Sequence, residues 1–428
     1  MKILISAYHC EPHKGSELAV GWNWVLQMAK FHDVFVFTQT GWRKEIERSL
    51  AQNPISRLTF TYVELPSWAL FWEKGRLGFE GHYYLWQVLA YFAGRRMHRK
   101  IGFDIVHHVT LGRYWMPSLL SLLPIPFIWG PVGGGESTPA SFRSSFSPRG
   151  KIFESLRDFA RKLGECDPFV KATGRRAVVA LATTQQTAVR LRMLGARRLV
   201  VVHPQFGMTR DERRFFELLG TRRQKPFRLI SMGRLLSWKG FHLGLLAFAK
   251  LQESHPDSEY WIINNGIEMG YLKGLARKLG VEDKVTFWGK LPTLRDVYGK
   301  LAECDVLVHP ALHEAFGNVC LEALASGRPV ICLDLGGPGL QVKEGTGIKV
   351  TPSAPETAVA ELAAAMVRLA SDPELRSSMG RAAQRSVEED FDWDRKGEFM
   401  AQVYEDALRT WHAEKEPKSE YRLDPWGP

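Results

Sequence analysis

The sequence predicts an α/β fold in which two doubly wound parallel-sheet domains face each other across a cleft. Three observations support this prediction. The chain has 428 residues, which suits two domains of about 200 residues each. Short apolar runs alternate with longer amphipathic segments in both halves, as parallel strands alternate with covering helices. Glycine-containing loops follow several of these runs, at the sheet edge where such folds bind ligands.

The first half of the chain contains seven apolar runs. Because strands of a parallel sheet are buried on both faces, we interpret these runs as strands and the segments between them as helices. The predicted strands are residues 2–7, 34–38, 58–63, 105–109, 126–129, 178–182 and 199–203. One predicted helix begins at residue 16 or 17 and ends near residue 30. Two others span residues 43–51 and 184–194.

The second half follows the same layout with a different sequence. Its predicted strands are residues 227–231, 260–263, 285–287, 305–308 and 330–333. Its predicted helices are residues 241–252, 317–325, 355–370, 373–389 and about 394–411. The polar and charged stretch 205–225 between the halves indicates an interdomain connection that is partly helical.

Composition and charge restrict the class of protein. With 45% hydrophobic and 24% charged residues, the chain is globular rather than disordered. It has no run of eighteen apolar residues, and its first residues, MKILISAYHC, predict a strand rather than a signal peptide. Its five cysteines lack metal-binding or CxxC spacing, which is typical of reduced core thiols in a cytoplasmic protein. The net charge of +11 predicts an anionic partner, namely a phosphate-bearing ligand, an acidic lipid surface or nucleic acid.

An aromatic and basic segment, residues 66–100, allows two interpretations. It could lie on an anionic membrane surface or bind a lipid-linked acceptor, or it could be a helix packed on the sheet with a solvated basic end. The helical spacing of its aromatic residues favours the packed helix. The residues concerned are Trp68, Phe71, Trp72, Phe79, Tyr83, Tyr84, Trp86, Tyr91, Phe92, Arg95, Arg96, His98, Arg99 and Lys100.

Three features of the first half lie where predicted strands end, at the edge of the sheet that binds ligands. Gly15, in the loop after the first strand, either approaches a ligand or only makes the turn. His107 and His108 are candidate ligand contacts, and each could equally be a core imidazole bonded to backbone. The run GPVGGGE, residues 130–136, permits close approach of the backbone to a ligand.

A loop of the second half, GRLLSWKG, carries cations suited to a phosphorylated ligand. Arg234 and Lys239 lie between a predicted strand and a predicted helix. A guanidinium, an ammonium and the free amides of a helix start together form a phosphate site. The alternative is two solvated cations on an exposed loop.

The run HPALHEAFGNVCLEALASGRPVICLDLGGPG contains two carboxylates, Glu314 and Glu322. The helix between its two strands is expected to begin near Gly317, so that the amides of Asn318 and Val319 can hold an oxyanion. A carboxylate accepts hydrogen bonds from two vicinal hydroxyls, the pattern that a ribose or hexose presents. The alternative is a capping glutamate and a partly exposed helix glutamate.

These motifs resemble the retaining glycosyltransferases of the GT-B fold, the nucleotide-sugar group called family 4 or group 1. The resemblance covers nearly the whole chain and is strongest from Gly233 to Gly347. The family signature, Glu-x7-Glu, matches Glu314 and Glu322 within HEAFGNVCLEALASGRPV. The runs GSELAVGWNW and GPVGGGE look like a subgroup of these enzymes. The fold implied consists of two Rossmann-like domains, in agreement with the pattern of elements.

The resemblance implies a role for each matching residue. Arg234 and Lys239 would bind the donor diphosphate, and Gly15 would face it. Glu314 would hold the hydroxyls of the transferred sugar, and Glu322 would hold the nucleotide ribose. Backbone contacts to the sugar and phosphates would come from Phe316, Gly317, Asn318 and Val319.

The chain departs from the family pattern at three places. The loop 264–267, NNGI, replaces a Gly-Asp-Gly-Pro that is frequent in the family. The family also implies that the nearby segment 287–291 borders the nucleotide base. Many family members have a sugar-contacting histidine two positions after the histidine that aligns with His107, and this chain has Val109 there. Gln341 stands where glutamate is frequent, which would alter a contact at a helix start.

The function implied is transfer of a hexosyl unit from a nucleotide diphosphate sugar to a hydroxyl of a carbohydrate or lipid-linked acceptor, with retention of configuration. The leaving diphosphate would help take the acceptor proton, so no protein nucleophile and no cofactor are expected. Cations in place of a DxD triplet imply that a metal is not required. The family and the basic aromatic segment suggest a peripheral place at the inner face of a membrane, in cell-surface polysaccharide or glycolipid synthesis.

Two other functions remain open on the sequence alone. A nucleotide-sugar epimerase or hydrolase would share the same cleft. A non-catalytic module that binds nucleic acid or membrane would suit the charge, although no nucleic-acid-binding motif is present and we expect no nucleic-acid partner.

The resemblance also implies a division of the chain. Residues 1–205 are expected to form the acceptor-binding domain and residues 226–390 the nucleotide-sugar-binding domain, joined by a linker, 206–225. Residues 391–412 form a final helix that is expected to pack back on the first domain. Residues 413–428 are expected to be a loose tail.

Overall fold

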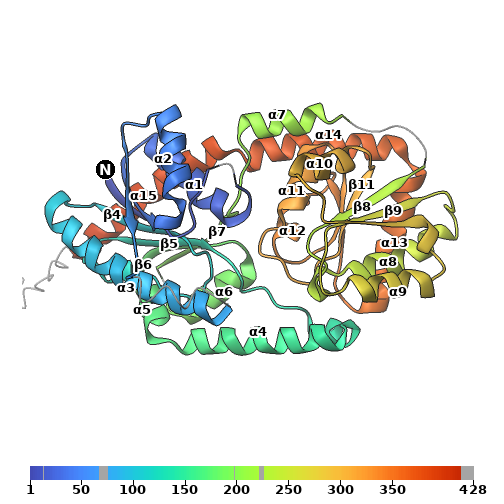
Figure 1. Ribbon diagram of the computed structural model, residues 1–428, viewed down its shortest axis with the longest axis horizontal. Helices are drawn as coiled ribbons and strands as arrows, with labels where there is room; N and C mark the ends of the chain where they lie inside the picture. Colours follow the sequence, from blue (N-terminus) through green and yellow to red (C-terminus); the bar gives the residue numbers. More distant parts are fainter. Residues whose placement is uncertain (13, 67–75, 197, 221–225, 416–428) are drawn as a thin grey trace, which may run out of the picture.

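The computed structural model describes residues 1–12, 14–66, 76–196, 198–220 and 226–415. They form two lobes side by side, each built on one twisted sheet with helices on both faces (Figure 1). The strand pairs in both sheets are parallel. The predicted fold class, α/β with two Rossmann-like doubly wound domains, is therefore confirmed.

The first sheet has its strands in the order β3-β2-β1-β4-β5-β6-β7. The strand order reverses between β1 and β4, so the loops after these two strands open a crevice at the carboxyl edge. The strands are β1 (Lys2–Ala7), β2 (Asp33–Gln39), β3 (Leu58–Val63), β4 (Ile105–Thr110), β5 (Phe127–Val132), β6 (Ala177–Ala182) and β7 (Leu199–Val202). The α-helices of this part are α1 (Ser16–Ala29), α2 (Arg43–Gln52), α3 (Arg76–Ile101), α4 (Pro148–Cys166), α5 (Pro168–Arg176) and α6 (Gln185–Met193).

The second sheet has its strands in the order β10-β9-β8-β11-β12-β13, with the reversal between β8 and β11. Its strands are β8 (Arg228–Met232), β9 (Glu259–Ile263), β10 (Val285–Gly289), β11 (Val306–His309), β12 (Val330–Leu333) and β13 (Gly347–Val350). The helices are α8 (Phe241–Gln252), α9 (Met269–Lys278), α10 (Leu294–Ala302), α11 (Asn318–Ala325), α12 (Gly336–Gln341), α13 (Pro355–Ser371) and α14 (Pro373–Asp390). Helix α7 (Arg210–Leu218) lies in the connection between the lobes, and α15 (Trp393–Lys415) ends the described chain.

The sequence does not predict helices α4, α5, α9, α10 and α12, or strand β13. Strand β13 is a four-residue strand at the sheet edge, GIKV, and α12 begins with two glycines and a proline. Helix α4 carries its most regular apolar spacing on the side that faces solvent. A search for apolar runs and inward-facing stripes therefore passes over α4, α12 and β13.

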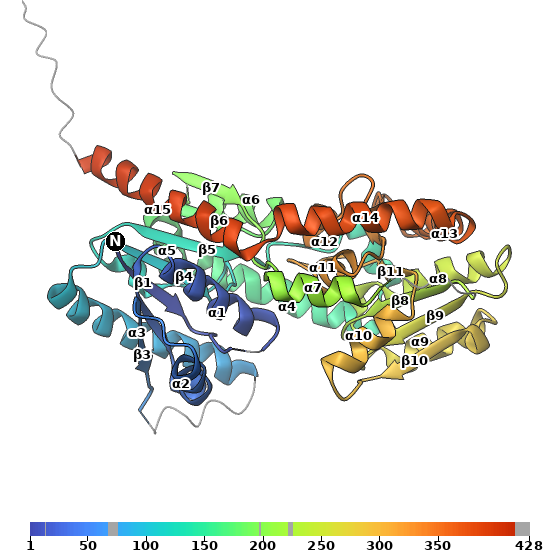
Figure 2. The same ribbon diagram turned by 90° about the horizontal axis from the view of Figure 1, so that it is seen from above.

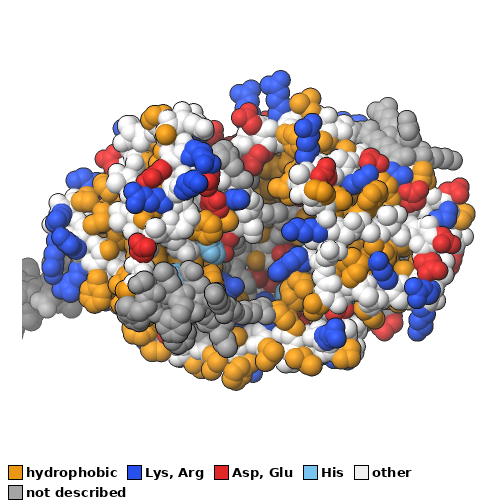
Figure 3. Space-filling view, viewed as in Figure 1, with side chains coloured by type: hydrophobic (Ala, Val, Ile, Leu, Met, Phe, Trp, Pro, Cys, Tyr) orange, Lys and Arg blue, Asp and Glu red, His pale blue; other side chains and the backbone are white. Residues whose placement is uncertain are grey.

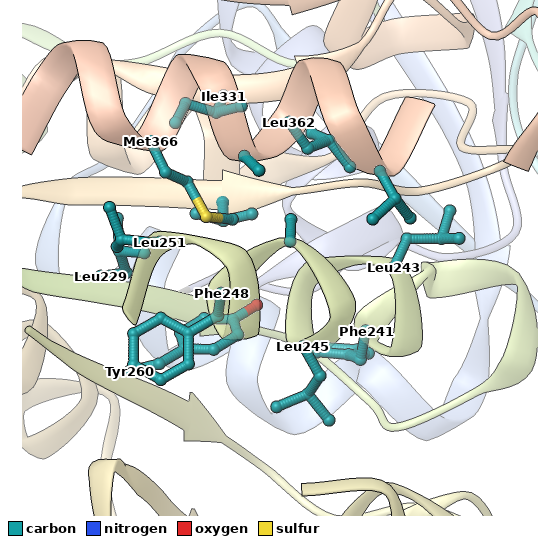
Figure 4. Close-up of a cluster of buried hydrophobic side chains, with 14 of the residues drawn as sticks. Leu229, Phe241, Leu243, Leu245, Phe248, Leu251, Tyr260, Ile331, Leu362 and Met366 are labelled. Atoms are coloured by element: carbon teal, nitrogen blue, oxygen red, sulfur yellow. The ribbon is translucent and has the colours of Figure 1, made fainter. Parts of the chain in front are cut away.

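On one face of the second sheet, the core lies between the strands and the helices α8 and α13 (Figure 4). Leu229 of β8 and Tyr260 of β9 are fully buried against Leu251 and Phe248 of α8, and Met366 of α13 closes the same cluster. Burying one such side chain stabilises the fold by roughly 1.5–3 kcal/mol. This packing fixes the strands from whose carboxyl ends the loops of the candidate site emerge.

Two of the crossings between the lobes, near Met208 and near Phe391, run side by side. The amide of Met208 donates to the Phe391 carbonyl at 2.7 Å, and the amide of Trp393 donates to the Met208 carbonyl at 3.2 Å. After the second crossing, α15 lies along the first lobe (Figure 2), where Trp393 and Tyr404 are buried in one cluster with Trp24 of α1. The two crossings are thus one hydrogen-bonded pair of segments.

The limits proposed for the domains stay a prediction. The first sheet ends at Val202 and the second begins at Arg228, on either side of the predicted linker 206–225. Phe142 and Phe146, however, lie within residues 1–205 and are buried in the core of the second sheet. This short excursion of the chain into the other lobe has no signal in the element pattern.

The aromatic segment 66–100 contains helix α3. Tyr83 and Trp86 are fully buried, and the other aromatic residues packed partly buried against the same core are Phe79, Tyr84 and Tyr91. Phe92 is 57% exposed, and Arg95, Arg96, Arg99 and Lys100 are exposed at the end of the helix. The structure therefore favours the packed helix with a solvated basic end. Trp68, Phe71 and Trp72 lie outside the described residues.

None of the described helices combines the length and the apolar character that a membrane span needs.

For His107 and His108 the structure favours the second of the two interpretations, a core imidazole bonded to backbone. Both side chains are fully buried in β4. His107 Nε2 donates to the carbonyl of Gly130 at 2.6 Å, so its Nδ1 accepts from the Tyr404 hydroxyl at 2.6 Å. His108 Nε2 donates to the Leu111 carbonyl at 3.0 Å. Burial lowers the pKa of each imidazole to about 4, so both are neutral histidines within the core.

Replacing Tyr404 by phenylalanine tests this account of His107. The change leaves the buried Nδ1 of His107 without a donor, so we expect the free energy of unfolding to fall by about 1–3 kcal/mol. Urea denaturation followed by circular dichroism measures the change. Tyr91→Phe is the control, because Tyr91 is only partly buried and its hydroxyl has no hydrogen-bond partner among the described residues. Equal stability of Tyr404→Phe and the parent protein would contradict the assignment.

Candidate active site

The candidate site lies at the carboxyl edge of the second sheet, where β8 and β11 end in neighbouring loops. The amide of Leu312 donates to the carbonyl of Trp238 at 2.8 Å, which ties the two loops together. Gly240 has φ +70°, and a Cβ there would lie 1.8 Å from the Pro310 carbonyl oxygen. Only glycine fits at this position, because any side chain would push the loops apart. This seating sets Lys239 at the end of one loop against Glu314 in the other.

Lys239 Nζ donates to the Glu314 carboxylate, and both side chains are about one-fifth exposed, at 18% and 21%. Burial lowers the pKa of Lys239 to about 8, and the guanidinium of Arg234 acts in the same direction. Arg234 itself is exposed on the same loop. The structure therefore brings three of the predicted residues together as two cations and one carboxylate at the edge of a crevice. An anion bound beside Arg234 would favour the charged form of Lys239 and so act against the effect of burial on its pKa.

His309, the last residue of β11, belongs to this cluster and was not among the predicted site residues. Its Nε2 lies 3.8 Å from Glu314 Oε2, and that buried nitrogen has no hydrogen-bond partner among the described residues. Burial, together with the charge of Lys239, lowers the pKa of His309 to about 3, so the ring is neutral. Its position at the end of a predicted strand, close to Glu314 in the sequence, is the feature that could have identified it as a site residue.

The loop from Glu314 turns into α11 at Gly317, which has φ +83° and caps the helix start. Phe316 is 4% exposed and its ring stacks on Phe206, with centroids 4.9 Å apart. Gln341 donates its side-chain amide to the Phe316 carbonyl, a bond that an ionised glutamate at this place cannot make. The loop is thus held from both sides, and the first-turn N–H groups of Asn318 and Val319 lack intrahelical acceptors.

Glu322 lies farther along α11 and accepts a hydrogen bond from the Tyr298 hydroxyl at 3.1 Å. Burial raises the pKa of Glu322 to about 7, although the bond from Tyr298 acts to lower it. Burial and the Glu322 charge in turn raise the pKa of Tyr298. The carboxylate is therefore ready to ionise when a ligand brings donors to it. No motif in the sequence pointed to Tyr298, which reaches Glu322 from α10.

The loop of the second sheet that departs from the family pattern borders the same edge. Asn264 has φ +97°, a conformation that asparagine tolerates better than most residues. Its amide donates to the Gly289 carbonyl at 2.7 Å, and the Leu235 amide donates to the Asn265 carbonyl at 3.0 Å. The NNGI loop therefore supports the backbone beside Arg234, and it lies against the predicted segment 287–291.

The first lobe contributes loops that face this cluster. Gly15 is exposed at the N-cap of α1, and a Cβ there would meet no atom within 4 Å. Its φ of −91° is one that any residue adopts, so neither the backbone nor a neighbouring atom requires glycine at this position. Next to it, Glu17 accepts from the Gly112 amide and lies 3.1 Å from His9 Nδ1. Burial acts to raise the pKa of Glu17, but the bond and charge of His9 lower it overall.

The glycine run 130–136 brings the two lobes into contact at the site. A Cβ on Gly133 would lie 2.9 Å from the Ala315 Cβ, so this loop touches the residue that follows Glu314. Glu136 holds the run in place, since it accepts from the Thr187 hydroxyl at 2.7 Å and from the Gly134 amide at 2.9 Å. Figure 3 shows the surface hollowed between the lobes, with blue cationic side chains on the rim of the second lobe. The predicted cleft between two domains is therefore present.

Among the described residues, no group of three His, Cys, Asp or Glu side chains is arranged to hold a metal ion.

Comparisons with known proteins agree with this geometry. The family model described as "Glycosyl transferases group 1" matches residues 218–386. The chain is 34% identical over 197 residues to glycogen synthase of Mycobacterium tuberculosis (strain ATCC 25618 / H37Rv), which covers 46% of each protein. The chain thus spans about half the length of that relative. It is 30% identical over 345 residues to D-inositol 3-phosphate glycosyltransferase of Streptomyces bingchenggensis, covering 75% of this chain and 70% of that protein.

Solved structures share the whole fold at low sequence identity. Sucrose-phosphate synthase of Thermosynechococcus elongatus superimposes with a TM-score of 0.62 and 19% identity, over 96% of this chain and 99% of that one. HepE of Anabaena in complex with UDP and glucose gives a TM-score of 0.59 and 17% identity, over 95% and 100%. The similarity to these structures establishes the GT-B fold. The match to the Streptomyces enzyme, which covers 75% of this chain, establishes the family relationship. The chain belongs to the glycosyl transferases group 1 family.

Proposed function

We propose that this protein transfers a hexosyl unit from a nucleotide diphosphate sugar to a hydroxyl acceptor, with retention of the anomeric configuration as in family 4 enzymes. The observation that carries the proposal is the cluster of Arg234, Lys239 and Glu314 beside the start of α11. The two cations can bind phosphates, and the carboxylate can accept hydrogen bonds from sugar hydroxyls. The solved HepE complex holds UDP and glucose, ligands of the two chemical classes proposed for this crevice.

The donor would bind with its diphosphate between the two cations and the first-turn amides of α11. Charge builds on the diphosphate as the bond from the sugar C1 to the leaving oxygen breaks, and fixed cations and amides stabilise that charge. Arg234 suits this role because its planar guanidinium binds phosphate oxygens in pairs. Glu322 would accept from the ribose hydroxyls, and Glu314 from hydroxyls of the transferred sugar. We propose that these groups need no metal and no cofactor.

The acceptor would lie against the first lobe, near the loops that carry Gly15 and Gly133. Its hydroxyl forms the new bond to C1 on the face that the diphosphate leaves, and its proton passes to a diphosphate oxygen. No protein nucleophile takes part. Approach of the two lobes would exclude water from C1, which protects the donor against hydrolysis. A carbohydrate or lipid-linked acceptor in cell-surface polysaccharide or glycolipid synthesis fits this arrangement.

The donor site is tested by screening nucleotide diphosphate sugars for thermal stabilisation of the protein. A ligand at a hundred times its Kd adds about 2.7 kcal/mol to the stability of the folded state. We expect one donor to stabilise the parent protein, and Lys239→Ala and Glu322→Ala to weaken its binding by about tenfold or more, because each loses a charged hydrogen-bond partner. Lys278→Ala, an exposed lysine on α9, is the matched control. Unchanged donor binding and turnover in Lys239→Ala would sink the assignment.

The stereochemical course is tested with the donor and acceptor identified in that way. We expect the first product to keep the anomeric configuration of the donor, because attack on the face of the leaving group needs no inversion. The proton NMR coupling at the anomeric position, read before mutarotation, decides the matter. An inverted product rules out the retaining mechanism, and rapid donor loss without acceptor would favour a hydrolase or epimerase in the same cleft.

Donor affinity is expected to pass through a maximum between about pH 7 and 8. Only an ionised Glu322 accepts from two hydroxyls, so affinity rises as the pH passes its pKa of about 7. Lys239 loses its charge above its pKa of about 8, so affinity falls again. Nucleotide diphosphate sugars have no phosphate group that titrates in this range, and calorimetry across it measures the profile. Glu322→Gln should abolish the rise and keep the fall, and an unchanged rise in that variant would contradict the role given to Glu322.

A further inference from the structure

Helix α4 presents an apolar stripe to solvent. Ile152, Leu156, Phe159 and Leu163 are 62%, 63%, 61% and 59% exposed, and their spacing of four, three and four places them on one side of the helix. Figure 3 shows hydrophobic side chains gathered along the lower edge of the molecule, where Figure 1 places α4. Single exposed apolar residues are common, but a row of four on one helix marks an interaction surface.

The opposite side of α4 is polar, and its groups are used within the protein. Glu154 accepts from His313 Nε2 at 2.9 Å, in the loop before Glu314. Arg157 and Arg161 donate to the Glu136 carbonyl at 2.8 and 3.0 Å, in the glycine run of the first lobe. The helix is therefore amphipathic in the reverse sense, with its charges turned inward and its apolar stripe outward. Folding within this chain leaves the stripe without a cover among the described residues.

The charges beside the stripe indicate what covers it. Lys151 and Lys162 flank it on one side and Arg149 on the other, and all three are exposed. The acidic residues of α4 lie on the inner face and are paired, Glu154 with His313, Asp158 with Arg143 and Glu165 with Arg190. An apolar row with two lysines on one side and one arginine on the other, without exposed acids on the helix, matches helices that lie in the surface of an anionic membrane. Two copies joined stripe to stripe would bring like charges together, which disfavours a dimer.

We propose that α4 docks the protein on an anionic lipid surface, with Ile152, Leu156, Phe159 and Leu163 inserted among the acyl chains and the flanking cations at the phosphate headgroups. The helix has 19 residues and is about 28 Å long. Because one side is apolar along the helix and the other side is charged, the helix would lie in the plane of the interface. This surface is separate from the basic end of α3, and the proposal does not depend on which sugar the enzyme transfers. The inner face of α4 touches both loops of the candidate site, so the bound membrane would lie close to the cleft.

Flotation with vesicles of equal parts phosphatidylcholine and phosphatidylglycerol tests the proposal. We expect the protein to bind these vesicles and not pure phosphatidylcholine. Leu156→Gln with Phe159→Gln should reduce the vesicle partition coefficient about tenfold or more, because two apolar side chains no longer insert among the acyl chains. Lys151→Gln with Lys162→Gln should reduce it about fivefold for each lysine. Leu218→Gln with Leu294→Gln is the control, since these leucines are 78% and 62% exposed on other helices.

Cys166 offers a second readout, because it is exposed at the end of α4 while Cys10, Cys304, Cys320 and Cys332 are buried. An environment-sensitive dye on Cys166 should shift to shorter wavelength with anionic vesicles, and not in Leu156→Gln/Phe159→Gln. Thermal unfolding of that variant should match the parent, because both side chains are exposed. Absence of vesicle binding by the parent protein would overturn the proposal. So would binding that the α4 variant retains, or a dimer that the variant abolishes without any vesicle binding.

Discussion

The site depends on how closely the loop after β8 is seated on the loop after β11. Gly240 leaves room for the Pro310 carbonyl, and the bond between Leu312 and Trp238 holds the two loops in register. Both loops start from neighbouring strands at the point where strand order reverses, so the packing of the sheet positions them. The pairing of Lys239 with Glu314 follows from this geometry. A cation and a carboxylate that neutralise each other in the free protein can each turn to a ligand that carries phosphates and hydroxyl groups.

Much of the fold follows from the sequence because the central strands are short and largely apolar, as is typical of strands buried on both faces. The site loops could also be placed, since Arg234, Lys239, Glu314 and Glu322 follow strands whose carboxyl ends share an edge. Contacts between distant segments could not be placed. Tyr298 reaches Glu322 from another helix, and the pair of Glu154 with His313 joins residues that are far apart in the chain.

Histidines illustrate why a motif does not decide the role of a side chain. His107, His108 and His309 all lie toward the ends of parallel strands beside a reversal of strand order. The carbonyl of Gly130 and the hydroxyl of Tyr404 occupy both nitrogens of His107, and α15 supplies the second of these from the far end of the chain. His309 has Glu314 and Lys239 as neighbours instead. The neighbours brought by the fold, and not the position in the strand, separate a core imidazole from one at the site.

The paired crossings at Met208 and Phe391 have a mechanical consequence. Because the two segments are bonded to each other, they form one joint between the lobes rather than two independent tethers. Helix α4 spans the lobes on the opposite side (Figure 1) and meets the second lobe through Ser147 with Glu268 and Glu154 with His313. The segment before α4 also places Phe142 and Phe146 in the core of the second sheet. The lobes are therefore tied together on both sides, and a wide opening of the cleft would have to disturb this second connection as well.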